Sequence, residues 1–298
     1  MPLPLWPFGC PDHRDQNPIL HYRGQFGSST LQEGGTLMHA LTRPFGALHV
    51  RSDGPDTGPA VVFANSLGTD LRLWDHVLPL LPPGLRLIRY DKRGHGLSST
   101  LGGDSLTDHA DDAIAVIEQV ARGPVVFVGL SIGGLIGQMV ASRRPDLIRA
   151  LVLSNTAAKL GTAQSWADRI AAVQASGVEG IADAVMERWF APAFRATPAL
   201  TLWRTMLART PAAGYIAACH ALATADQRAA TAALRLPVLV IAGSQDGASP
   251  PALVRETAAL IPGAAFHEIP DAGHLPCVET PAQWAALVAP FLKAHAHA

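Results

Sequence analysis

The sequence contains few cysteines and few charged residues. Its three cysteines, Cys10, Cys219 and Cys277, are odd in number and widely spaced. That spacing builds neither a disulfide framework nor a C-x-x-C metal site, so we expect a reducing compartment. Charged residues make up 16% of the 298 residues, and the formal net charge is −1. Because so small a net charge cannot attract polyanions, we expect no nucleic-acid partner and no membrane-surface binding.

Long apolar runs and cofactor motifs are also missing. No run of about 18 apolar residues is present, so we expect no transmembrane helix. The first eight residues lack a basic region and do not resemble a signal peptide, which favours a cytoplasmic location. The chain has no H-E-x-x-H pattern, no clustered Cys and His, and no G-x-x-x-x-G-K-[ST] pattern. We therefore expect no metal and no cofactor. The sequence carries no marker of an oligomeric state.

Apolar residues make up 48% of the chain, which is enough for one large α/β domain with a well-packed core. Residues 1–37 differ from the rest: they are rich in Pro, Gly, Ser, Gln and His and show no period of 2 or 3.6. We expect them to form a poorly ordered extension outside the fold. Met38 follows directly and is an alternative start of the globular chain.

Short apolar strands alternate with helical patterns along most of the chain. Repeated βα units of this kind predict an α/β fold with a mostly parallel sheet and helices on both faces. Residues 156–232 depart from the alternation because they are alanine-rich and lack strand patterns. We interpret them as a helical cap inserted into a core made of residues 38–155 and 233–298. The expected strands are 47–51, 60–64, 85–90, a short one from 125, 148–154, 237–243 and 265–269; the expected helices are 73–81, 106–122, 165–175, 180–190, 199–209, 211–224, 251–260 and 281–294.

The stretch Gly129-Leu130-Ser131-Ile132-Gly133 fits the G-x-S-x-G pattern of a nucleophile elbow. An apolar strand precedes it and an apolar helix follows it. A serine raised on a sharp strand-to-helix turn needs neighbours without side chains, because Cβ atoms there would collide with the adjoining elements. The pattern therefore predicts that Ser131 is a nucleophile. The alternative is a glycine-rich connection that contains an ordinary serine.

A serine nucleophile needs a base, and the base needs an orienting acid. In this type of fold the acid and then the histidine follow the serine along the chain. Asp246 comes directly after a buried strand, and His274 follows the last strand beside Gly273. Of the twelve histidines, His274 alone lies after the acid, in a loop and at the right end of a strand. Asp271 is a competing acid, although it is close in sequence to His274.

Attack on a carbonyl creates an oxyanion, which two backbone N–H groups usually stabilise. The amide of Ile132, the residue after the nucleophile, is the first expected donor. The second is expected from the loop after the second strand, 65–68, and we assign it to the amide of Leu67.

From about residue 48 to residue 292 the chain resembles the α/β-hydrolase superfamily. More narrowly, it is similar to the 3-oxoadipate enol-lactonases of the protocatechuate and catechol (β-ketoadipate) pathway. The loop 65–70 and the cap segment 155–162 are the more specific parts of this resemblance. Two residues depart from the pattern of the family: Lys159 stands where an arginine is expected in many relatives, and Gly273 stands where several have a serine. The matching stretches are 65–70 with Trp74, 89–96, 129–138, 155–162 with Trp166, 182–185, 188–190, Gly214-Tyr215 and Cys219.

The resemblance implies hydrolysis of 3-oxoadipate enol-lactone to 3-oxoadipate. The expected partner is therefore a small-molecule lactone that carries a carboxylate. A pocket for such a substrate needs a cation or strong hydrogen-bond donors. We offer Lys159 and Trp166 from the start of the cap as substrate-binding residues, with Arg169 as a further candidate. A solvated lysine on the cap surface is the alternative interpretation of Lys159.

Two other functional hypotheses remain open on the sequence. One is a different ester, lactone or thioester hydrolase, including haloperoxidase-like enzymes, with the same three residues. The other is a ligand sensor of the same fold that binds and turns over slowly. Dehalogenases and epoxide hydrolases are disfavoured, since they need a carboxylate at the position of Ser131.

Overall fold

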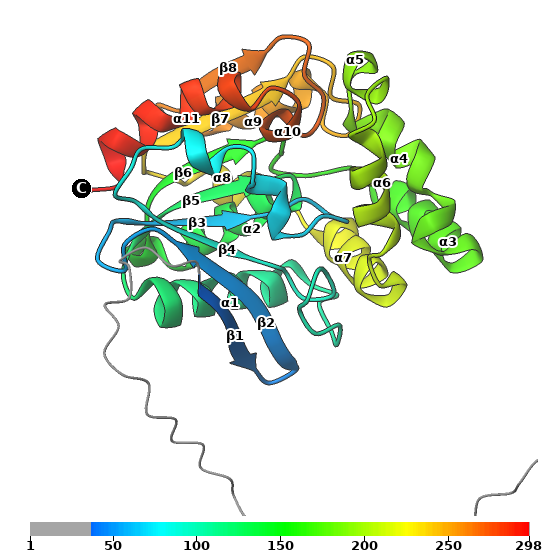
Figure 1. The fold of residues 1–298 in the computed structure, drawn as a ribbon, viewed down its shortest axis with the longest axis horizontal. Coiled ribbons are helices and arrows are strands. Elements are labelled where there is room, and N and C mark those ends of the chain that lie inside the picture. Colours follow the sequence, from blue (N-terminus) through cyan, green and yellow to red (C-terminus); the bar gives the residue numbers. More distant parts are fainter. Residues whose placement is uncertain (1–36, 298) are drawn as a thin grey trace, which may run out of the picture. The chain divides into compact units, whose positions relative to one another are not determined.

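The computed structural model describes residues 37–297. In this range eight strands form one sheet in the order β1-β2-β4-β3-β5-β6-β7-β8 (Figure 1). Along this order, neighbouring strands pair in parallel from β4 through β3, β5, β6 and β7 to β8. Strand β2 pairs antiparallel with both β1 and β4. The α/β fold and the mostly parallel sheet predicted from the sequence are therefore confirmed. The strands are β1 (Leu37–Arg43), β2 (Gly46–Asp53), β3 (Ala60–Ala64), β4 (Arg86–Tyr90), β5 (Val125–Leu130), β6 (Ile148–Ser154), β7 (Val238–Gly243) and β8 (Ala265–Ile269).

Helices cover both faces of the sheet. Every residue of β4, β5 and β7 is buried, which requires packing on each side of the strands. One group of helices packs together from α1 through α2 and α8 to α9, and another joins α10 and α11 to two short 3₁₀ turns, η1 (Leu71–Trp74) and η2 (Leu78–Leu80). The helices are α1 (Leu106–Val116), α2 (Ile132–Arg143), α3 (Ala163–Gly180), α4 (Ala182–Trp189), α5 (Pro192–Arg195), α6 (Leu200–Ala208), α7 (Ala212–Thr224), α8 (Arg228–Ala232), α9 (Pro251–Leu260), α10 (Pro276–Glu279) and α11 (Pro281–His295). None of the helices within residues 37–297 is long and apolar enough to span a bilayer.

Predicted and observed elements agree best where short apolar runs are bounded by turn residues. The predicted strands 60–64 and 265–269 and the predicted helix 251–260 match β3, β8 and α9. Strand β1 was not predicted. The short helix expected at 73–81 was wrong, since η1 and η2 occupy this region as separate 3₁₀ turns. The extension predicted for residues 1–37 lies outside the described residues, except that Leu37 begins β1.

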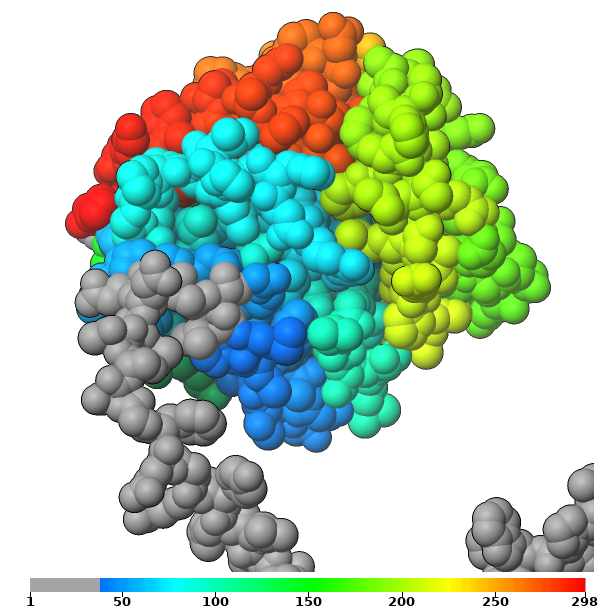
Figure 2. Space-filling model, viewed as in Figure 1, coloured from blue at the N-terminus to red at the C-terminus, as the bar shows by residue number. Residues whose placement is uncertain are grey.

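Six helices, α3 to α8, lie between β6 and β7 in the segment 156–232, which we call the cap. Figure 2 shows this green to yellow-green segment packed against cyan and orange-red parts of the chain. The cap reaches the loops at the strand ends through its backbone: Trp189 O accepts a hydrogen bond from His274 N at 2.6 Å, and Arg188 O accepts one from Gly247 N at 3.1 Å. These contacts fix the distance between the cap and the two loops.

The turn between β5 and α2 is packed so closely that glycine is required on both sides of Ser131. A Cβ at Gly133 would lie 2.0 Å from Ala64 O on β3. A Cβ at Gly129 would lie 2.3 Å from Gly133 O. Real Cβ atoms do not approach backbone oxygens so closely, because packing at that range is repulsive. The two glycines therefore let β5, α2 and β3 converge around the serine.

This packing predicts the stability of two alanine variants. We expect Gly133→Ala to lower the free energy of unfolding by about 1–3 kcal/mol or more, as overpacking of a closed core does. Gly123→Ala is the matched control, since nothing lies within 4 Å of a Cβ there. It should change stability by less than about 1 kcal/mol. Urea unfolding followed by circular dichroism measures both, and equal stability of the two variants would contradict the packing argument.

Candidate active site

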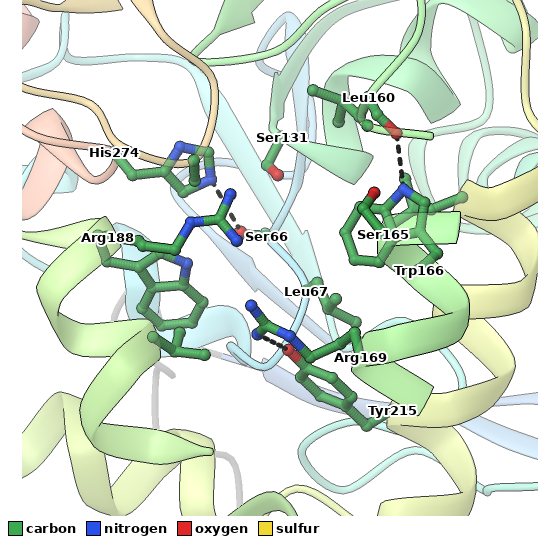
Figure 3. Close-up of a pocket in the computed structure, with 15 residues that line it drawn as sticks. Ser66, Leu67, Ser131, Leu160, Ser165, Trp166, Arg169, Arg188, Tyr215 and His274 are labelled. Carbon is green, nitrogen blue, oxygen red and sulfur yellow. Dashed lines mark hydrogen bonds between the residues drawn. The ribbon is translucent and has the colours of Figure 1, made fainter. Parts of the chain in front are cut away.

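Four loops meet at the carboxyl ends of the parallel strands, beneath the cap. A pocket of about 120 Å³ lies between these loops and the cap (Figure 3). Ser131 and His274 line it from the side of the sheet, and Trp166, Arg169 and Arg188 line it from the cap. Ligands of open α/β sheets usually bind at this edge. The loops follow β3, β5, β7 and β8 and carry residues 65–70, 131, 244–250 and 270–275.

Ser131 stands at the tip of the turn between β5 and α2. Its backbone has φ 58° and ψ −122°, a conformation that residues with side chains rarely adopt. Such strain is typical of functional positions and persists only where the surrounding structure imposes it. The residue is 8% exposed and lines the pocket. The hydroxyl is thus held at the pocket surface by the backbone alone.

His274 and Asp246 form a buried pair beside Ser131. His274 Nδ1 lies 2.8 Å from Asp246 Oδ2, and both side chains are almost fully buried. Because the carboxylate can only accept, the proton of the neutral imidazole resides on Nδ1, and Nε2 is left as the basic nitrogen. Nε2 faces the pocket, 3.5 Å from Ser66 Oγ. This is the orientation that a general base requires.

The carboxylate of Asp246 is saturated with donors. Its Oδ1 accepts from the backbone amides of Ala248 at 2.7 Å and Ser249 at 2.9 Å. Its Oδ2 accepts from Asn155 Nδ2 at 3.0 Å and from Ser249 Oγ at 2.9 Å. Burial by itself raises the pKa of Asp246, but its interaction with the imidazole of His274 and these hydrogen bonds outweigh burial and lower the pKa below the ordinary value. The acid therefore remains ionised beside the histidine.

The structure does not place the competing acid on His274. Asp271 lies on an exposed turn, where its Oδ1 accepts from Gln245 Nε2 at 3.2 Å and its amide donates to Ser244 Oγ at 2.9 Å. Asp246 is the carboxylate that contacts the imidazole. In the described part of the chain, no hydrogen bond joins Ser131 Oγ to His274. Such bonds are often long before a substrate binds and shorten in the complex.

Two backbone amides, each next to a pocket-lining serine (Ser66 or Ser131), have no acceptor among the described residues. Neither Leu67 N–H nor Ile132 N–H donates to any group in the described part of the chain. Ile132 is the first residue of α2, so its amide belongs to the unpaired donors at the positive end of that helix. Leu67 lines the pocket beside Ser131. These are the two amides that we expect from the sequence to donate hydrogen bonds to the oxyanion.

The predicted cap residues separate into two groups. Trp166 and Arg169 line the pocket, and Trp166 Nε1 donates to Leu160 O at 2.7 Å. Lys159 is not among the pocket-lining residues: its ammonium lies 3.3 Å from Asp226 on an exposed surface. The structure therefore favours the alternative interpretation of Lys159 as a surface lysine.

Sequence reasoning did not assign roles to Arg188, Tyr215, Asn155 and Ser249. Arg188 Nε donates to Gly247 O at 3.1 Å, and Arg169 Nη1 donates to Tyr215 Oη at 3.3 Å. Burial lowers the pKa of Arg188, and the charge of Arg169 lowers it further. The two guanidinium groups therefore repel each other across the pocket. No carboxylate within residues 37–297 lies within 4.0 Å of either group. The pocket consequently presents two cations that lack a partner anion.

Among the described residues, no cluster of three or more His, Cys, Asp or Glu side chains is placed to hold a metal ion.

A family model described as the alpha/beta hydrolase fold matches residues 59–281. The chain belongs to the alpha/beta hydrolase family. It is 39% identical to 3-oxoadipate enol-lactonase 2 of Acinetobacter baylyi over 209 residues, which cover 69% of this chain and 78% of that protein. It is 33% identical to 3-oxoadipate enol-lactonase 1 of the same organism over 248 residues, or 83% of this chain and 93% of that protein.

A solved structure extends the similarity to the whole fold. The crystal structure of the enol-lactonase from Burkholderia xenovorans superposes with a TM-score of 0.80 at 35% identity. The match covers 83% of this chain and 96% of that one. Together with the family match, these relatives identify the protein as an ester or lactone hydrolase of this family that resembles the enol-lactonases.

Glu279 ties the His274 loop to the cap. Its Oε1 accepts from Gly273 N and its Oε2 from Ala191 N, each at 2.8 Å. Burial raises the pKa of Glu279 to about 7, although the backbone donors oppose this shift. The folded protein therefore binds more protons at this group than the unfolded chain between pH 4.5, its ordinary pKa, and about 7. Proton binding to Glu279 therefore stabilises the folded state. This stabilisation is complete below pH 4.5 and is lost as the pH rises through 7.

This linkage predicts how Glu279→Gln responds to pH. The variant cannot take up the proton, so its stability relative to the wild type should improve as the pH rises from about 5 to about 8. Urea unfolding at several pH values measures the difference. Glu256→Gln, at an exposed position of α9, is the control and should follow the wild type at every pH. A difference between Glu279→Gln and wild type that does not vary with pH would refute the proposed linkage.

Proposed function

We propose that this protein is a serine hydrolase that opens the ring of 3-oxoadipate enol-lactone to give 3-oxoadipate, a step in the degradation of aromatic compounds through protocatechuate or catechol. The observation that carries the proposal is the composition of one pocket: Ser131 on its strained turn, the His274–Asp246 pair, and two guanidinium groups without a carboxylate partner. The relatives named 3-oxoadipate enol-lactonase support the choice of substrate.

The reaction begins with attack on the lactone. Ser131 Oγ forms a bond to the carbonyl carbon while His274 Nε2 takes its proton, and Asp246 stabilises the resulting imidazolium. The carbonyl oxygen becomes an oxyanion between the amides of Leu67 and Ile132. Removal of one such donor typically costs about 3 kcal/mol of transition-state stabilisation.

Ring opening needs little acid assistance. When the tetrahedral intermediate collapses, the bond from the acyl carbon to the ring oxygen breaks, and the leaving group is an enolate, which is a weaker base than an alkoxide. The enolate stays attached to the acyl group, takes up the proton that His274 received from Ser131, and becomes the ketone of the product, so that His274 is neutral again. Water then gives a proton to His274 and attacks the acyl carbon, and Ser131 leaves with the proton held by His274.

The carboxylate of the substrate is the anion that Arg169 and Arg188 lack. Both guanidinium groups face the pocket from the cap, one on α3 and one on α4 (Figure 3). A carboxylate between them would relieve their mutual repulsion and accept charge-assisted hydrogen bonds from each. In this arrangement the carboxylate fixes the lactone ring while its carbonyl lies over Ser131.

The first test is an ultraviolet assay for loss of the enol-lactone. Wild-type protein should turn over the lactone many times, and Ser131→Ala should lower kcat by about 10³-fold or more, because the nucleophile is absent. A single burst of product would favour a ligand sensor. Absence of turnover would eliminate the proposed substrate, and undiminished turnover by Ser131→Ala would eliminate the mechanism.

The second test separates binding from chemistry. Arg169→Met and Arg188→Met should each raise KM for the lactone by about tenfold to hundredfold, the value of a hydrogen bond to a charged group, and should change kcat less. Lys159→Met removes the same charge from the cap surface and should leave KM unchanged. A rise in KM with Lys159→Met but with neither arginine variant would reverse this assignment of the substrate carboxylate.

A further inference from the structure

Lys92 is a buried cation close to the pocket, yet the mechanism above does not use it. It lies two residues after the end of β4 and is 2% exposed. No carboxylate of residues 37–297 lies within 4.0 Å of its ammonium. Burial lowers the pKa of Lys92 to about 7, although the carboxylates of Asp91 and Asp70 oppose this shift. Burying an ammonium without a charged partner costs stability, so an apolar side chain would be the more stable choice.

The contacts of this ammonium are backbone oxygens of one loop. Lys92 Nζ donates a short hydrogen bond to Ser66 O and a longer one, at 3.4 Å, to Thr69 O. Ser66 O also accepts from Thr69 Oγ1 at 2.9 Å and from Thr69 N at 3.3 Å. Three donors therefore converge on a single carbonyl, and the ammonium is the one that carries a charge.

The carbonyl of Ser66 and the amide of Leu67 belong to the same peptide group. In a trans peptide the C=O and N–H bonds point in opposite directions, and residues 37–297 contain no cis peptide. An anchor on Ser66 O consequently fixes the direction of Leu67 N–H. That amide has no acceptor among the described residues, and Leu67 lines the pocket beside Ser131. Donors on the oxygen also polarise the peptide and strengthen its N–H as a donor.

We propose that Lys92 is a positioning residue for the oxyanion site: its ammonium holds and polarises the Ser66–Leu67 peptide so that Leu67 N–H is aimed at the oxygen of the attacked carbonyl. The inference rests on the proposed function, in which Leu67 N–H is an oxyanion donor. Lys92 touches neither substrate nor reacting atoms. It acts through one peptide group, and the charge that it brings matters most when the oxyanion forms.

The test compares Lys92→Met with Lys293→Met. Each removes one lysine, but Lys293 is exposed on α11 and does not line the pocket. Lys92→Met should lower kcat for p-nitrophenyl acetate by about tenfold to hundredfold with little change in KM, less than the loss of an entire donor. Its affinity for phenylboronic acid, which forms a tetrahedral anion on serine, should fall by a similar factor. Lys293→Met should match the wild type in each measurement.

An NMR measurement tests the same inference without turnover. In ¹⁵N-labelled protein, Lys92→Met should move the Leu67 amide proton upfield, since the peptide loses its polarising charge, while the Ile132 amide proton stays. Thr69→Val removes a neutral donor from the same carbonyl and should produce a smaller shift in the same direction. If Lys92→Met does not fold, the shift in Thr69→Val still tests whether donors on Ser66 O polarise the Leu67 N–H.

The outcomes separate the two proposals. An unmoved Leu67 amide proton in the folded variants, or kcat and boronate affinity within about twofold of wild type in Lys92→Met, would overturn the role of Lys92. Failure of the wild type to hydrolyse the enol-lactone would overturn the proposed substrate and leave the Leu67 measurement to decide on Lys92.

Discussion

Ser131 has a positive φ, a conformation that costs a residue with a side chain about 1–3 kcal/mol and that persists only under constraint from its surroundings. The constraint is the close approach of three elements. Strand β5 ends directly before the serine, α2 begins directly after it, and Gly133 packs against Ala64 at the end of β3. This one turn fixes the hydroxyl, the first amide of α2 and the position of the loop after β3, and the rest of the site is arranged around them.

Charged groups behind the pocket are held by backbone atoms more than by opposite charges. Asp246 accepts from two backbone amides besides Asn155, Ser249 and His274, and Lys92 donates to two backbone carbonyls. Backbone partners do not change rotamer, so they keep the acid and the cation in place at a small entropic cost. Lys92 also connects two loops, because both of its partners belong to the loop after β3.

The cap contributes part of the wall of the pocket. It is joined to the catalytic loops through the carbonyls of Arg188 and Trp189 and through the carboxyl group of Glu279. Gly273 permits this approach, since a Cβ there would lie 2.3 Å from Trp189 O. The glycine at this position is thus explained by the proximity of the cap to the histidine loop.

The sequence predicted the sheet and its edge well because apolar runs bounded by turn residues are local signals. Ser131, Asp246 and His274 each come after a strand. Because the carboxyl ends of parallel strands lie at one edge of the sheet, the sequence alone predicts that these three residues lie close together. Cap residues were harder to assign. Helix α7 of the cap is apolar on several sides, so its periodicity does not reveal which face covers the pocket.

Lys159 and Arg188 illustrate the difference between the two kinds of signal. Both are cations in the cap, and only the packing of α4 against the loop after β7 shows that Arg188 lines the pocket. The burial of Lys92 could not be predicted from the sequence either, because a lysine in a loop is usually exposed. Its burial depends on contacts between segments about 25 residues apart, which no local pattern encodes.

The central claim is that Ser131 forms a covalent acyl-enzyme with a lactone. Rapid acid quench of the wild type with 3-oxoadipate enol-lactone, followed by mass mapping of peptides, tests it most directly. Because the leaving group of a lactone stays attached, the peptide that contains Ser131 should gain the mass of the whole substrate, and the Ser131→Ala protein should gain nothing. Modification of a different residue, with turnover retained in Ser131→Ala, would contradict the account.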